Sequence, residues 1–106
     1  MPFRGLILSF ACILFCVAQA TAATGTVVYR ESGCDYFVVH TANGYDLLEW
    51  YGGWEPDKGD VLVGSFEEYG MHDIYDSTAD DEVTVWVEEY WLSREDALEE
   101  LVEKCE

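Results

Sequence analysis

Short runs of β-branched and aromatic residues, each bounded by turn-forming residues, recur along most of this chain. They lie at 26–30, 36–41, 45–51, 60–66, 70–75 and 82–92. A spacing of about 8–12 residues between such runs is typical of small all-β domains. Closure of the sheet would bury its apolar face and remove exposed strand edges. The sequence therefore predicts a mainly β fold, a five- to six-stranded antiparallel barrel or rolled sheet.

Three local patterns refine this prediction. Ala42-Asn43-Gly44 separates two of the runs, and Asn-Gly is a strong signal for a tight hairpin. Gly64 interrupts another run and indicates a bulge or a bend in the barrel. Val83, Val85 and Val87 alternate with polar or aromatic residues, so they should line the interior face of a strand while Trp86 and Tyr90 lie on the other face.

After residue 92 the pattern changes to that of an amphipathic helix. Ser93 is a good N-cap, and Asp96 follows three residues later, as in a capping box. The apolar positions Leu98, Leu101, Val102 and Cys105 have helical spacing. We therefore expect a C-terminal helix over residues 93–105, with these four side chains on its buried face.

The first 22 residues have the pattern of a secretory signal peptide. Arg4 precedes an apolar run from Gly5 to Val17, and small residues follow, with cleavage expected after Ala20, Ala22 or Ala23. The alternative is a transmembrane anchor, but the apolar run is short and no basic cluster follows it. The sequence thus predicts an exported protein, periplasmic or extracellular, whose single domain spans residues 23–106.

Export to an oxidising compartment would decide the state of the cysteines. Cys12 and Cys16 lie in the predicted signal peptide, which leaves Cys34 and Cys105. Two cysteines in an oxidising compartment are expected to form a disulfide. The alternatives are two free thiols or a redox pair, although redox pairs are usually close in sequence. The predicted bridge would fasten the C-terminal helix to the loop between the first two strands.

The chain is strongly acidic, with 22 Asp and Glu against 5 Lys and Arg and a formal net charge of −17. Hydrophobic residues make up 50% of the chain, so the acidity is not that of a disordered tail. This charge argues against binding to nucleic acid or to an anionic membrane. It would instead steer a cationic partner towards the protein, or serve as a solubility or salt adaptation.

Four phrases resemble those of small exported bacterial proteins of unknown function: GCDYFVVHT (33–41), LLEWYGG (47–53), PDKGDVLVG (56–64) and VEEYWLSREDALEEL (87–101). The third is also similar to turn-and-strand segments of OB-like and SH3-like barrels. The resemblance implies such a barrel, and it brings no activity with it.

No catalytic constellation is recognisable in the sequence. There is no G-x-S-x-G motif, and the only histidines are His40 and His72. His72 is followed by Asp73, but neighbouring residues in a strand point to opposite faces, so these two would not form a base and its orienting acid. We therefore expect a non-enzymatic protein without a cofactor.

A calcium site is the alternative to a protein without a cofactor. Asp76, Asp80, Asp81 and Glu82 place four carboxylates within seven residues. Calcium prefers oxygen ligands from a flexible loop, although the spacing is not that of an EF-hand. The other interpretation is a solvated loop between two strands.

Aromatic residues give the second candidate ligand surface. Trp50 and Trp54 flank Gly52-Gly53, and Trp86 and Tyr90 lie in the last strand, with His72 as a further candidate. Aromatic rings beside carboxylates occur in protein interfaces and in sugar-binding surfaces, although many of these rings are also needed for the core. The sequence favours an interaction domain for a cationic protein or peptide. The alternative is a carbohydrate- or cell-wall-binding module, assisted by calcium.

Overall fold

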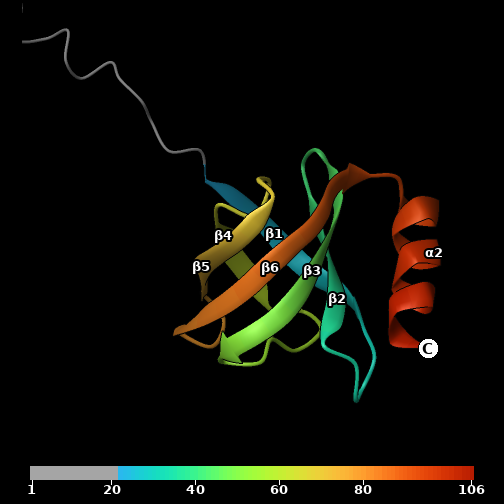
Figure 1. Ribbon diagram of the computed structural model, residues 1–106. Coiled ribbons are helices and arrows are strands. Elements are labelled where there is room, and N and C mark those ends of the chain that lie inside the picture. The colour runs from blue at the N-terminus through green and yellow to red at the C-terminus, as the bar shows by residue number, and fades with distance from the viewer. Residues whose placement is uncertain (1–21) are drawn as a thin grey trace, which may run out of the picture.

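The computed structural model describes residues 22–106, which form six strands and one helix (Figure 1). The elements are β1 (Ala23–Arg30), β2 (Tyr36–Thr41), β3 (Gly44–Gly53), β4 (Val61–Gly64), β5 (Gly70–Asp76), β6 (Asp81–Leu92) and α2 (Arg94–Cys105). The predicted signal peptide lies outside the described residues, apart from Ala22. In the described part of the chain, no helix has the length and apolar character needed to cross a membrane.

The strands close into a barrel in the order β1-β2-β3-β6-β5-β4, and all the pairings are antiparallel. Two meanders, β1-β2-β3 and β4-β5-β6, are joined by the pairs β3–β6 and β1–β4. The order of strands around the closed barrel stays the same when β1 is exchanged with β4, β2 with β5 and β3 with β6. The predicted mainly β fold, antiparallel barrel and C-terminal helix are confirmed, and of the two expected forms the sheet is a closed barrel.

Two glycines act where backbone or side chains approach closely. The hairpin between β2 and β3 turns at Ala42-Asn43, because Thr41 pairs with Gly44. Gly44 has φ +138°, and a Cβ there would lie 2.9 Å from the Leu92 carbonyl oxygen. The turn in the structure therefore lies one residue earlier than the Asn-Gly pair that predicted it. A Cβ on Gly64, at the end of β4, would lie 2.6 Å from the Ile74 side chain, so this end of the strand requires glycine.

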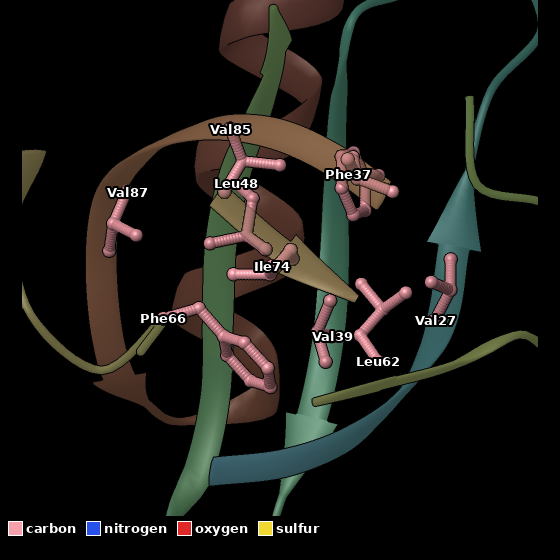
Figure 2. Packing of buried hydrophobic residues seen from close by; sticks show 10 residues of the cluster. Val27, Phe37, Val39, Leu48, Leu62, Phe66, Ile74, Val85 and Val87 are labelled. Atoms are coloured by element: carbon pink, nitrogen blue, oxygen red, sulfur yellow. The ribbon is translucent and has the colours of Figure 1, made fainter. Parts of the chain in front are cut away.

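The barrel interior is filled by apolar side chains from all six strands and from Phe66 in the loop after β4 (Figure 2). Its fully or almost fully buried members are Val27, Phe37, Val39, Leu48, Leu62, Phe66, Ile74, Val83, Val85 and Val87. Val83, Val85 and Val87 all point inward, as the alternation predicted. The opposite face of this part of β6 therefore points out of the barrel.

The helix α2 packs on the outside of the barrel against β2 and β3 (Figure 1). Ala97 and Leu101 are buried there against Val38 and Leu47. The Ser93 hydroxyl accepts a hydrogen bond from the Asp96 backbone N–H at 3.1 Å, so the predicted N-cap forms. Val102 is 58% exposed, however, so its predicted place on the buried face is wrong. The helix contacts the barrel along one narrow stripe at i, i+4 spacing, and Val102 lies beside it.

The disulfide between Cys34 and Cys105 joins the end of α2 to the loop between β1 and β2. The two Cα atoms are 5.4 Å apart and the cysteines are separated by 71 residues. This is the predicted pairing. It fixes the last turn of the helix beside the start of β2.

Candidate functional site

Four neighbouring strands each contribute one side chain to a row across the outer surface of the barrel. Tyr36 of β2 pairs with Glu49 of β3, Glu49 with Trp86 of β6, and Trp86 with Met71 of β5. Directly paired residues of antiparallel strands share a face of the sheet. Trp86 is 38% exposed and Met71 is 48% exposed. We call this row, with the carboxylates beside it, the aromatic–acid face: Tyr36, Glu49, Met71, Asp73, Trp86 and Glu88.

Hydrogen bonds hold the side chains of this face in place. The Trp86 indole N–H donates to a Glu88 carboxylate oxygen at 3.2 Å. The Asp73 carboxylate accepts from the Thr84 hydroxyl at 2.7 Å. Burial, together with a hydrogen bond to the Glu49 carboxylate, raises the pKa of Tyr36 to about 12. The face is therefore a fixed arrangement of rings and carboxylates.

A lysine of the same chain occupies one end of the aromatic–acid face. Lys104 Nζ lies 5.5 Å from the centre of the Tyr36 ring and 3.4 Å from Glu88 Oε2. An ammonium group over an aromatic ring is attracted by the ring's quadrupole. Beside Lys104 the surface is hollowed into a depression of about 290 Å³ whose lining includes the Asp35, Glu49 and Glu106 side chains. This end of the face thus combines a bound cation with further carboxylates.

A second, larger hollow lies at the rim of the barrel near Trp54, and we call it the Trp54 cleft. Its volume is about 520 Å³, within the roughly 300–1,000 Å³ of small-molecule sites. Its polar and aromatic lining consists of Arg30, Ser32, Trp54, Glu55, Asp57 and Lys58. The Arg30 guanidinium forms an ion pair with Glu55, and its Nη1 is buried with no hydrogen-bond partner among the described residues.

Two buried carboxyl groups lie behind the Trp54 cleft. Asp60 accepts hydrogen bonds from the Trp54 indole N–H at 3.3 Å and the Asp57 backbone N–H at 3.1 Å. The Asp76 carboxyl next to it is fully buried, and its Oδ2 has no hydrogen-bond partner among the described residues. Burial and the neighbouring Asp60 carboxyl raise the pKa of Asp76 to about 6. Burial opposes ionisation of Asp60, but its hydrogen bonds lower its pKa below the usual value. Because so little of either carboxyl reaches solvent, the pair has a structural role here.

A third buried carboxyl, Asp46 in β3, holds the end of β6. Its Oδ1 accepts a hydrogen bond at 3.0 Å from the backbone N–H of Trp91, which has φ +60°. A bulky residue in this left-handed conformation is strained, and the bond to Asp46 helps to hold it. Burial raises the pKa of Asp46 to about 7. This contact sets the direction in which the chain leaves β6 for α2.

The structure separates the four aromatic residues that the sequence grouped as a candidate ligand surface. Trp54 lines the cleft and Trp86 the aromatic–acid face. Trp50 packs against the barrel interior and donates its indole N–H to the Trp54 carbonyl oxygen at 3.1 Å. Tyr90 also packs against the interior. The register of β6 shifts between Val87 and Glu89, so the prediction that Trp86 and Tyr90 share a face is wrong.

The two histidines have different surroundings. His72 Nε2 lies 3.1 Å from the Glu68 carbonyl oxygen and 3.9 Å from Glu68 Oε1. Its neighbour Asp73 bonds to Thr84 instead. His40 is exposed and stacks on the Tyr45 ring at 4.4 Å. His72 therefore belongs to neither of the two hollowed surfaces.

The four carboxylates proposed as calcium ligands do not point to one centre. Asp76 accepts from the Thr78 and Ala79 backbone N–H groups, both at 3.0 Å. Asp80 accepts from the Tyr75 hydroxyl, and Asp81 from the Glu82 backbone N–H. Within residues 22–106 no group of three or more His, Cys, Asp or Glu side chains is placed to hold a metal ion. Calcium binding by Asp76, Asp80, Asp81 and Glu82 stays a prediction.

Most of the residues that form these two surfaces were not identified from the sequence. Tyr36, Glu49 and Met71 join Trp86 only through the pairing of four strands, which no local pattern reveals. The sequence contains one indication that Arg30 and Lys58 belong to a site, because cations are rare in this chain and both of these lie beside turn-forming residues.

In comparisons with known proteins, no family model, curated protein or solved structure matches this chain. The resemblance to small exported bacterial proteins therefore stays a prediction.

Proposed function

We propose that this protein is an exported, non-enzymatic interaction domain that binds a cationic protein or peptide on its aromatic–acid face. The observation that carries the proposal is the position of Lys104, whose ammonium group lies over Tyr36 and against Glu88. A lysine or arginine of a partner would meet the same chemistry at Trp86, between the carboxylates of Glu49 and Glu88. Such a contact contributes about 0.5–2 kcal/mol, depending on how far it is desolvated.

The rest of the molecule favours the same kind of partner. With a formal net charge of −17, the chain produces a long-range field that attracts cations and raises their rate of association. The face itself supplies apolar area, since Trp86 and Met71 are adjacent and both exposed. The field would bring the partner to the surface, and burial of these two side chains would slow its release.

The test is the affinity for a lysine-rich peptide, measured by fluorescence anisotropy at two salt concentrations. Raising the ionic strength from about 0.01 to 0.15 M shortens the Debye length from about 30 to 8 Å. We expect the dissociation constant to rise at least tenfold over this range. An affinity independent of salt contradicts the proposal.

Two variants locate the site. Trp86→Ala removes the exposed ring and is expected to weaken binding about tenfold, equivalent to about 1.4 kcal/mol. Tyr69→Ala is the matched control, because Tyr69 is 61% exposed but lies in the loop before β5, outside the face. Equal effects of the two substitutions would refute the assignment to this face.

A second candidate function is the binding of a carbohydrate or cell-wall polymer, with calcium at the 76–82 loop as an auxiliary. The Trp54 cleft supports it, since a half-exposed ring there lies beside several polar side chains. Retention on a glycan column that is lost in Trp54→Ala would support this function, and an absence of retention would argue against it.

A further inference from the structure

We propose that the Trp54 cleft binds an uncharged saccharide, with a sugar ring stacked on Trp54 and its hydroxyl groups bonded to the charged side chains around it. This inference rests on the second candidate function and names its ligand class. The side chains of this cleft are not those of the aromatic–acid face, although the two hollows adjoin at Gly33, so variants of each set test the two sites separately.

The aromatic wall of the cleft is held in a fixed position. The Trp54 indole N–H donates to Asp60, its backbone N–H donates to the Glu82 carbonyl oxygen at 2.9 Å, and its own carbonyl oxygen accepts from Trp50. The side chain is nevertheless 39% exposed and lines the hollow. A ring that is tied by its N–H and open to solvent offers a flat apolar surface with little loss of entropy on binding.

The polar lining provides both donors and acceptors. The Arg30 guanidinium, which is paired with Glu55, and Lys58, which has no ion-pair partner among residues 22–106, are the donors. Asp57 and Glu55 supply acceptors, and Ser32 supplies a hydroxyl group. A sugar hydroxyl both donates and accepts, so a mixed set of this kind matches it better than it matches a group of one charge.

The charge balance of the cleft points to an uncharged ligand. Of the five Lys and Arg residues, two line this one hollow beside the carboxylates of Glu55 and Asp57, with Asp60 behind Trp54, so the cleft is closer to charge balance than the rest of the chain. Elsewhere the acids greatly outnumber the bases. Inside the cleft a cation gains little from the surrounding charges, and an anion must still overcome the field of the whole molecule. A neutral ligand escapes both effects, and its affinity is expected to be independent of salt.

The experiment is a titration of the ¹⁵N-labelled, oxidised protein with uncharged gluco-, manno-, xylo- and N-acetylglucosamine oligosaccharides. The four tryptophans give four indole N–H signals, so each ring reports separately. We expect at least one of these sugars to shift the Trp54 signal at millimolar concentration, with Trp86 and Trp91 unchanged. Raising the ionic strength should leave the affinity the same.

Variants provide the second readout. Trp54→Ala is expected to weaken the binding about tenfold. Because this substitution also removes a bond to Asp60, Lys58→Gln is measured beside it, since the latter removes a side chain with no ion pair and should weaken binding several-fold without changing stability. Trp86→Ala, on the other surface, should bind as the unchanged protein does.

Three outcomes overturn the inference. If neither an uncharged oligosaccharide nor the acidic oligogalacturonate shifts the Trp54 signal, both the inference and the second candidate function fail. If oligogalacturonate binds more tightly than every neutral sugar, carbohydrate binding stands but its ligand is acidic. If the lysine-rich peptide is what shifts Trp54, the cleft belongs to the site for the cationic partner.

Discussion

At the scale of single residues, three buried carboxyl groups accept hydrogen bonds that fix the ends and turns of strands. Asp46 of β3 bonds to Trp91 at the end of β6, Asp60 to Trp54, and Asp76 to the turn that follows it. Burying a carboxyl group favours its neutral form, and this is why the pKa of Asp46 and that of Asp76 are raised. In so acidic a chain, nothing in the sequence distinguishes these three from the exposed acids.

Asp46→Asn should remove part of the pH dependence of stability. The folded-state pKa of Asp46 is raised from 3.8 to about 7. Its contribution to the free energy of unfolding is therefore fully present below pH 3.8 and is lost as the pH rises through 7. The free energy of unfolding of the unchanged protein should therefore fall between about pH 4 and 7. Asparagine keeps the acceptor for the Trp91 N–H without a charge, so the variant should be more stable at pH 8 by about 2–4 kcal/mol.

Urea denaturation at pH 5 and pH 8 measures this effect, with the exposed Asp73→Asn as the control. The Asp60–Asp76 pair leaves some pH dependence in the variant, since the pKa of Asp76 is also raised. If the free energy of unfolding falls by the same amount between pH 5 and pH 8 in Asp46→Asn and in the unchanged protein, the role assigned to Asp46 is wrong.

At the scale of elements, the helix α2 depends on its cap and its covalent link more than on a wide apolar face. Only Ala97 and Leu101 are buried in it. Ser93→Ala removes the hydroxyl that accepts from the Asp96 N–H and is expected to cost about 1 kcal/mol. Thermal unfolding measures the loss, and Ser93→Thr, which keeps an acceptor, should stay close to the unchanged protein. A cap that contributes nothing would leave the midpoints of all three proteins equal.

The disulfide is the second support of this element. Replacing Cys34 and Cys105 by serine should lower the free energy of unfolding by roughly 4 kcal/mol, since the bridge closes a long loop of the unfolded chain. Chemical denaturation of the oxidised protein and of the double variant gives the difference. We also expect the variant to lose the contact of Lys104 with Tyr36, because Cys105 fixes the last turn of α2. Equal stability of the two proteins would contradict this account.

Elements with local signals could be predicted from the sequence, and their arrangement could not. The helix was predictable because its N-cap and period lie within a dozen residues, and the bridge because only two cysteines follow the predicted signal peptide. The strand order β1-β2-β3-β6-β5-β4 depends on contacts between distant segments. The register shift after Val87, which turns Tyr90 inward, depends on the partner strand β3. The aromatic–acid face follows from that order, so only Trp86 could be named in advance.

At the scale of the whole molecule, a small barrel carries a large negative charge and two hollowed surfaces with different local charge. The aromatic–acid face is rich in carboxylates and holds Lys104, whereas the Trp54 cleft balances two cations against two acids. If the two proposals hold, binding at the first surface is expected to depend on salt and binding at the second to be independent of it. The protein is thus expected to distinguish its ligands by charge.

The most direct test of the central claim is to map where a lysine-rich peptide binds. The ¹⁵N-labelled protein is titrated with the peptide at low salt, and shifts of the backbone and indole N–H signals are recorded. We predict that the shifts concentrate on Tyr36, Glu49, Met71 and Trp86, with the Trp54 signal unchanged, and that salt reverses them. Shifts spread evenly over the acidic surface, or centred on the Trp54 cleft, would contradict the proposed function.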